Sequence, residues 1–255
     1  MSIGGGMRFR ADGRARGQLR PVSIELDVQK WVAASLVYRQ GDTHVLVSAT
    51  VEDRIPPHLR GKGTGWITAE YSMLPGATSE RSQRESVRGR VGGRTHEIQR
   101  LIGRALRGVV DTAVLGERTV TLDCDVLQAD GGTRCASITG SFVALSLALR
   151  RIGLERAVRN RIAAVSVGIV DGTPLLDLEY TEDSRAEVDF NVVGTDAGTY
   201  VEVQGTAEGK PFDRAQMVRL LDLADEGMRR LFEIQDEAIE RGSSLRRPAG
   251  SPGSR

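Results

Sequence analysis

The segment from residue 119 to residue 151 constrains the fold more than any other part of the chain. Thr119–Leu127 alternates apolar and polar residues, which is typical of a strand, and an apolar helix follows it. The apolar residues of this helix recur at helical spacing at Ile138, Phe142, Leu145 and Leu149. Gly131 and Gly132 turn the chain between the two elements. Such a corner leaves unpaired backbone N–H groups at a helix N-terminus, where the helix dipole favours an anion.

Apolar periodicity predicts two sets of strands. The first set is Val22–Leu26, Ala34–Arg39, Val45–Val51, Trp66–Met73 and Thr119–Leu127. The second set is Ala163–Val170, Pro174–Leu178, Ala186–Val192 and Tyr200–Gly205. Both sets lie within one continuous sequence, without a linker rich in Pro, Gly and Ser between them.

Helical periodicity predicts a helix at Ile98–Val109 and another near Asp213–Glu240, in addition to the helix that follows Gly132. The order of strands, two helices, strands and a final helix predicts an α+β (mixed α/β) fold with two related halves around central helices. We expect one domain over residues 7–241. The linker-like composition of residues 242–255 predicts a disordered tail.

Several classes of protein are excluded by composition. No apolar run approaches the ~20 residues of a membrane span, and the first residues lack the apolar core of a signal peptide. Cys124 and Cys135 form no CxxC motif, and His44, His58 and His96 are isolated. We therefore expect a cytoplasmic protein with reduced thiols, no structural zinc and no membrane partner.

Charge is unevenly distributed, although the net charge is only +1. Residues 79–107 contain eight arginines and three acidic residues, whereas residues 171–208 contain ten acidic residues and one arginine. One region is suited to a polyanion and the other to a metal ion. On charge alone, a solvated charged surface explains the pattern equally well.

Two glycine-rich corners carry the candidate anion ligands. Gly132, Thr133 and Arg134 begin one predicted helix, and "GGRT" at 92–95 begins the other. Backbone amides, a hydroxyl and two planar guanidinium groups suit phosphate oxygens. The first corner matches neither the P-loop nor the dinucleotide fingerprint, so inorganic phosphate, or one phosphate of a polymer, fits better than a nucleotide. The alternative is a purely structural turn with Thr133 as helix cap.

Five motifs resemble the ribonuclease PH family of phosphorolytic exoribonucleases. They are "GWITAEYSMLP", "GGRTHEIQRLIGRALR", "LDCDVLQADGGTRCASITG", "AAVSVGIVDG" and "VEVQGTAEGKPF". The resemblance runs from about Arg8 to about Ala238 and implies a ribonuclease PH-like fold. It also implies phosphate-dependent 3′-to-5′ trimming of RNA, especially tRNA precursors, with release of nucleoside diphosphates and a reversible nucleotidyl addition. The family assembles as a homo-hexamer, a trimer of dimers, and includes exosome-type ring subunits.

The resemblance assigns roles to particular residues of this chain. It implies that inorganic phosphate, the co-substrate, binds to Arg94, Gly132, Thr133 and Arg134. Asp183 and Asp189 match paired aspartates associated with Mg²⁺ or with acid catalysis, and those two roles remain open. Asp123 and Asp125 lie two residues apart on a strand, so they face the same side and are further candidate metal ligands, with structural ion pairs as the alternative.

The stretch "SERSQRESVRGR" reads as a mobile basic loop. The resemblance implies that Arg81 and Arg84 in this loop bind RNA. Gly76 departs from the family pattern, in which many members carry arginine, and removes one phosphate contact. A non-catalytic RNA-binding ring subunit is the alternative function, but such proteins typically lose the arginines or aspartates that are all present here. Hydrolytic two-metal chemistry would need a larger set of carboxylates.

Overall fold

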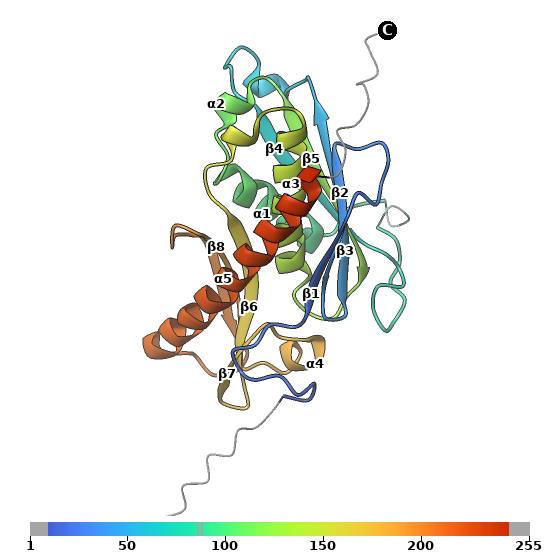
Figure 1. Cartoon of the computed structure of the whole chain (residues 1–255). Coiled ribbons are helices and arrows are strands. Elements are labelled where there is room, and N and C mark those ends of the chain that lie inside the picture. Colours follow the sequence, from blue (N-terminus) through green and yellow to red (C-terminus); the bar gives the residue numbers. More distant parts are fainter. Residues whose placement is uncertain (1–9, 86, 88, 245–255) are drawn as a thin grey trace, which may run out of the picture.

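The computed structural model describes residues 10–85, 87 and 89–244, which form two sheets with helices between and around them (Figure 1). The first sheet has the order β1-β2-β3-β5-β4 and contains β1 (Val22–Leu26), β2 (Ala34–Gln40), β3 (Thr43–Glu52), β4 (Trp66–Met73) and β5 (Thr119–Gln128). Only β4 and β5 are parallel neighbours in this sheet. The second sheet is antiparallel, has the order β7-β6-β8-β9, and contains β6 (Ile162–Val170), β7 (Thr173–Leu176), β8 (Val188–Thr195) and β9 (Tyr200–Ala207).

Three long helices complete the core. They are α1 (Gly93–Arg107), α3 (Thr133–Arg151) and α5 (Arg214–Ser244). The predicted strands and long helices are all present, with ends that differ by a few residues, and the α+β fold is confirmed. Two single-turn helices, α2 (Thr112–Leu115) and α4 (Tyr180–Asp183), were not predicted, because one turn is too short to show a hydrophobic period.

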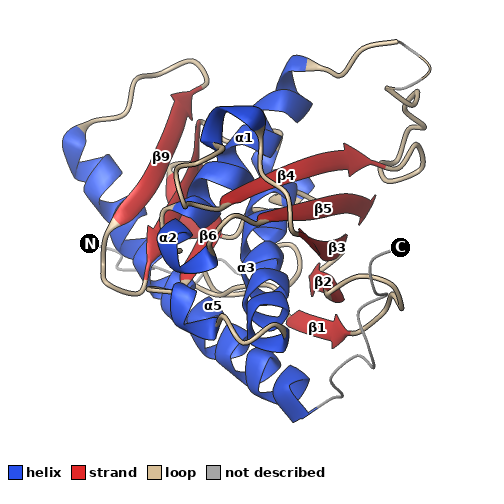
Figure 2. Ribbon diagram, turned by 90° about the horizontal axis from the view of Figure 1, so that it is seen from above, coloured by secondary structure: helices blue, strands red, loops and turns tan. Residues whose placement is uncertain are grey.

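Helix α3 lies between the two sheets. It contacts β2, β3 and β5 on one side and β6 on the other, and it also contacts α1 and α5. All residues from Cys135 to Leu149 are buried, as expected for a helix surrounded by other elements. Gly140 lets α3 pack closely against β2, because a Cβ there would lie 3.1 Å from the Tyr38 side chain. Figure 2 shows α1 and α3 along the same face of the first sheet.

Helix α5 connects both halves. It packs along the second sheet and also reaches α3 and β1. The fully buried Gln235 on α5 donates its side-chain amide to the carbonyls of Thr139 on α3 and Ile162 on β6, each at 3.0 Å. The helix runs to Ser244, so residues 242–244 of the expected tail are helical, and residues 245–255 lie outside the described residues.

The helices of the described residues include none that is long and apolar enough to cross a membrane. Cys124 and Cys135 are both buried free thiols. Burial raises the pKa of each thiol to about 12, so both stay protonated at neutral pH.

Replacing Phe142 with alanine tests the central position of α3. The ring is buried between the sheets, so Phe142→Ala should lower the free energy of unfolding by about 3–5 kcal/mol in urea titration. Val218→Ala, at a side chain on α5 that is 46% exposed, is the matched control and should change it by less than about 0.5 kcal/mol. Equal losses for the two variants would contradict the packing described here.

Candidate active site

The corner between β5 and α3 is built to receive an anion. Gly131 and Gly132 both have positive φ, 71° and 66°, and Gly132 is the N-cap of α3 without a side-chain cap bond. Thr133 is therefore the first residue of the helix, and the alternative that it caps the helix is wrong. A left-handed residue followed by a helical one turns successive N–H groups to one side, which forms a concave anion-binding nest.

Two contacts fix this corner in place. A Cβ on Gly131 would lie 2.5 Å from the Leu178 carbonyl oxygen, so no side chain fits between the corner and the segment before α4. The Thr133 hydroxyl lies 2.9 Å from the hydroxyl of Tyr71 on β4. Burial raises the pKa of Tyr71, which stays protonated and able to donate. Tyr71 was not predicted as a site residue, and its only sequence signals are the strand pattern and its place in the motif "GWITAEYSMLP".

The second corner places Arg94 at an equivalent position. Gly92 is the N-cap of α1, so Arg94 is the second residue of its helix, as Arg134 is in α3. The Arg94 side chain has no hydrogen-bond or ion-pair partner among the described residues. The neighbouring Thr95 hydroxyl donates to Glu85 Oε1 at 2.7 Å, which holds the preceding loop against the start of α1.

Arg134 is held by groups from both halves of the fold. Its guanidinium donates to Glu97 Oε1 on α1 at 3.2 Å and to Gln204 Oε1 on β9. The Gln204 amide also donates to Glu97 Oε1, at 3.3 Å. Glu97 and Gln204 were not predicted as site residues, because their contacts join segments far apart in sequence. Both lie within the quoted motifs, which was the only available signal.

Two carboxylates complete the site. Asp183 ends α4 and Asp189 lies on β8. Burial, and then the charge of Asp183, raise the pKa of Asp189 to about 6, while Arg134 and Arg94 act in the opposite direction. Burial also raises the pKa of Asp183, and the same two arginines oppose it. Arg94 and Arg134, from the first half of the fold, therefore act electrostatically on both Asp183 and Asp189, from the second half.

Asp189 has an unused ligand atom. Its Oδ1 is buried and has no hydrogen-bond partner in the described structure. Buried polar atoms normally find a partner, so a ligand fits this position. Within residues 10–85, 87 and 89–244, no group of three or more His, Cys, Asp or Glu side chains is arranged to hold a metal. Magnesium often uses only one or two carboxylates and takes its other ligands from water and substrate phosphates, so the pair fits that ion.

Asp123 and Asp125 lie away from this site. They face the same side of β5, as predicted, but the intervening Cys124 faces α3 and contacts Ser141. The two aspartates are therefore on the sheet face opposite the helices. Asp123 accepts a hydrogen bond from Ser48 at 3.4 Å, and burial, followed by the charge of neighbouring strand residue Glu70, raises its pKa. Strand alternation therefore puts Asp123 and Asp125 on one face of the sheet, but this is not the face that carries the helices of the proposed site.

The two candidate RNA-binding arginines line different cavities. Arg81 lines a cavity of about 660 Å³ together with Asp130 and Tyr180, beside the corner that precedes α3. Arg84 lines another, of about 460 Å³, with Glu70. Ser86 and Arg88 of the same basic loop lie outside the described residues. A Cβ at position 76 would meet open space, so Gly76 is not required by packing.

Comparison with models of known protein families shows which family the chain belongs to. Residues 18–150 match the model of the 3′ exoribonuclease family, domain 1, and residues 160–227 match its domain 2. The chain belongs to this family. The two matched regions correspond to the two halves described above, and the proposed active site lies where they meet.

Close relatives and structural neighbours agree with this assignment. The chain is 57% identical over 236 residues to "Ribonuclease PH" of Moorella thermoacetica, covering 91% of this chain and 94% of the relative. It is 55% identical over 237 residues to "Ribonuclease PH" of Solibacter usitatus, covering 91% and 100%. Rice (Oryza sativa) Rrp46 has the same fold, with a TM-score of 0.74, 19% identity and coverage of 90% and 100%. The Archaeoglobus fulgidus exosome with RNA bound to the active site also shares it, with a TM-score of 0.74, 24% identity and coverage of 88% and 92%.

The raised pKa of Asp189 predicts a pH-dependent effect of Asp189→Asn on stability. The folded-state pKa, about 6, lies above the ordinary 3.8. The stabilising contribution of the protonated acid is therefore complete below about pH 3.8 and is lost as the pH rises through about 6. Above that, ionised Asp189 destabilises the fold by at most about 3 kcal/mol.

Asp189→Asn should accordingly raise the free energy of unfolding at pH 8, and this gain should disappear near pH 4. Urea titrations at both pH values, in phosphate-free buffer with EDTA, measure the effect. A gain of the same size at both values would contradict the assigned pKa.

Proposed function

We propose that this chain is a phosphate-dependent 3′-to-5′ exoribonuclease that removes the last nucleotide of RNA as a nucleoside diphosphate and catalyses the reverse nucleotidyl addition. The observation that carries the proposal is that Arg94 and Arg134, from one half of the fold, act electrostatically on both Asp183 and Asp189, from the other half. The family and the relatives called ribonuclease PH support the same reaction.

Inorganic phosphate occupies the cationic side of this site in our proposal. Gly132, Thr133 and Arg134 supply backbone N–H groups at the start of α3, and Arg134 and Arg94 supply guanidinium groups. Attack on RNA brings a phosphate dianion against an anionic phosphodiester. The two repel each other, so fixed cations and N–H groups are needed to hold them in line. Arg94, which has no partner among the described residues, is available for this contact.

The reaction exchanges one phosphorus–oxygen bond for another. An oxygen of inorganic phosphate forms a bond to the phosphorus that links the last two nucleotides, and the bond from that phosphorus to the 3′ oxygen breaks. The electron pair stays on the 3′ oxygen, which takes up a proton and becomes the new RNA end. The released nucleotide carries the added phosphate as a nucleoside diphosphate.

Asp183 and Asp189 act on the leaving side. We assign them a Mg²⁺ ion, because the unused Oδ1 of Asp189 and the adjacent carboxylate of Asp183 suit a cation that takes its other ligands from water and phosphate. Such an ion would neutralise charge on the scissile phosphate and the 3′ oxygen. The pKa of Asp189, about 6, favours a second role in the metal-free site, as donor of the proton to that oxygen.

In this proposal, arginine side chains bind RNA through the negative charge of its phosphate backbone. Arg81 lies beside the corner that holds phosphate, and Arg84 extends the cationic surface along the same loop. The RNA is a tRNA precursor with a 3′ trailer, and the absence of an arginine at Gly76 weakens its binding. We also propose a homo-hexameric ring, a trimer of dimers, and a cytoplasmic location, as in the ribonuclease PH family.

A non-catalytic ring subunit is less consistent with the site. A site without catalysis does not require an Arg94 side chain that has no partner among the described residues, or an aspartate with a pKa raised to about 6. The relatives at 55–57% identity carry the name of the enzyme, whereas the two structural neighbours are below 25% identical and show only a shared fold.

Phosphate dependence tests the function directly. Incubated with RNA that bears a 3′ trailer, the protein should shorten it only when inorganic phosphate is present, and the products should be nucleoside diphosphates. Chromatography of the released nucleotides measures this. Nucleoside monophosphates released in phosphate-free buffer would show hydrolysis and overturn the proposal.

Arg94→Ala in the same assay tests the assigned site. Loss of this cation should lower kcat/KM for phosphate by about 10²–10³-fold, while RNA binding in a filter assay stays within about threefold. Arg150→Ala is the matched control, because Arg150 lies at the far end of α3 and contacts Ser243. Unchanged turnover in Arg94→Ala, or an equal loss in the control, would refute the role of Arg94.

A further inference from the structure

Five buried charged side chains form one ion-pair network that contacts the proposed phosphate corner. They are Arg10, Arg14, Arg20, Asp177 and Glu182. The arginines come from the segment before β1, Asp177 directly follows β7, and Glu182 lies on α4. A buried ion pair is weak grounds for a gain in stability, because apolar residues of similar size often serve as well. A cluster of this size therefore calls for a role in fixing geometry.

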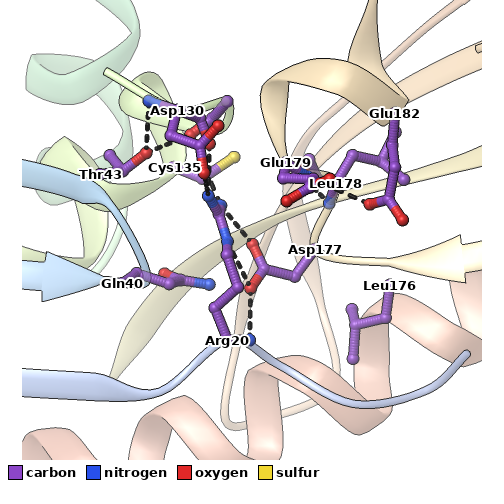
Figure 3. Close-up of polar contacts among 12 residues, drawn as sticks. Arg20, Gln40, Thr43, Asp130, Cys135, Leu176, Asp177, Leu178, Glu179 and Glu182 are labelled. Atoms are coloured by element: carbon purple, nitrogen blue, oxygen red, sulfur yellow. Dashed lines mark hydrogen bonds and ion pairs between the residues drawn. The ribbon is translucent and has the colours of Figure 1, made fainter. Parts of the chain in front are cut away.

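Arg20 is the member that touches the phosphate corner. Its guanidinium lies between Asp130 and Asp177 (Figure 3). Nη1 donates to the Asp130 carbonyl oxygen, and Nη2 lies 3.5 Å from the Gly131 carbonyl oxygen. On the other side, Nη2 donates to Asp177 Oδ1 at 2.7 Å and Nε donates to Oδ2 at 3.1 Å. One planar group thus joins the corner before α3 to the chain before α4.

Asp177 is itself firmly fixed. Its backbone has a φ of 56°, its N–H donates to the Ser166 carbonyl at 2.7 Å, and its carbonyl accepts from Arg10 at 2.8 Å and Arg14 at 3.0 Å. Burial alone would raise the pKa of Asp177, but the charge and hydrogen bonds of Arg20 outweigh burial and lower that pKa below its ordinary value. Asp177 is therefore an ionised anchor for Arg20.

The same cluster holds the helix that bears Asp183. Arg10 forms a bidentate ion pair with Glu182, the residue before Asp183. Its Nε donates to Oε1 at 2.7 Å, and its Nη2 donates to Oε2. Glu182 also accepts from the Glu179 N–H at 3.2 Å in the capping box of α4. The arginines before β1 therefore contact both sides of the proposed active site, the anion corner through Arg20 and the acidic side through Arg10.

We propose that Arg20 is a positioning residue for the phosphate co-substrate, which fixes the Gly131–Gly132 corner against Asp177 and so sets the distance between bound phosphate and the Asp183 side of the site. The proposal rests on the phosphorolytic function argued above. Arginine is required because the donors of lysine all lie on one compact ammonium nitrogen, which lacks the planar fork that joins Asp177 to the Asp130 carbonyl. Loosening the corner weakens the phosphate site and leaves the basic loop that binds RNA in place.

Arg20→Lys tests this role, because it keeps a charge beside Asp177 and loses the bridge. We expect the KM for phosphate to rise about tenfold, with the KM for RNA within about twofold of the wild type. A variant that is merely less stable has fewer folded molecules, so its apparent kcat falls while both KM values stay unchanged. The ratio of the two KM values therefore separates positioning from a structural role.

Thr43→Val keeps the proposal testable if Arg20→Lys folds poorly. The Thr43 hydroxyl donates to the Gly131 carbonyl at 2.7 Å and accepts from the Asp130 N–H at 3.0 Å, so it holds the same corner without any charge. Valine has a similar shape, and this variant should also raise the KM for phosphate selectively, by about threefold or more.

Arg151→Lys is the matched control. Arg151 likewise joins a carbonyl, that of Ala33 at 2.7 Å, to an aspartate, Asp27 at 2.6 Å, but near the other end of α3. Its KM for phosphate should equal that of the wild type. The proposal for Arg20 would be overturned if both Arg20→Lys and Thr43→Val had the wild-type KM for phosphate. It would also be overturned if Arg151→Lys raised that KM as much as Arg20→Lys does. Wild-type protein without phosphate-dependent activity would instead overturn the proposed function.

Discussion

Repulsion between two phosphates is the physical constraint on which this structure depends. Inorganic phosphate and the RNA backbone are both anions, and the proposed reaction requires them in contact. In the proposed site this constraint is met by two helices with similar glycine corners, because Arg94 and Arg134 are each the second residue of their helix, α1 and α3. The charges of these two arginines oppose the raised pKa values of Asp183 and Asp189 in the other half, which we propose form the acidic side of the site.

The fold explains why this arrangement is rigid. Helix α3 is enclosed by both sheets, so its N-terminus cannot move without disturbing the core. The glycines before it allow the chain to approach Leu178, which brings the first half against the second. Behind the corner, Arg20 and Asp177 join the same two segments by charge. Both the packing of the glycine corner and the buried ion pair of Arg20 with Asp177 therefore hold the start of α3 against the segment before α4.

Features of the fold and site that depend on neighbouring residues could be predicted from the sequence, whereas those that join distant segments could not. Strand alternation and the apolar helix after Gly132 depend on neighbouring residues, and both were predicted within a few residues. The family motifs indicated Arg94, Arg134, Asp183 and Asp189, and their convergence required the structure. Tyr71, Gln204 and Arg20 were missed because each acts through a partner more than sixty residues away, and no local pattern marks such a pair. Asp123 and Asp125 show the converse, since a correct local pattern placed them on the wrong face for the site.

Phosphate binding measured by isothermal titration calorimetry, in the wild type and in Arg94→Ala and Arg134→Ala separately, tests the central claim most directly. If both guanidinium groups hold one anion, the wild type binds one phosphate per chain and either substitution weakens that single site by about tenfold or more. Two phosphates per chain, each lost with only one of the substitutions, would contradict the shared site.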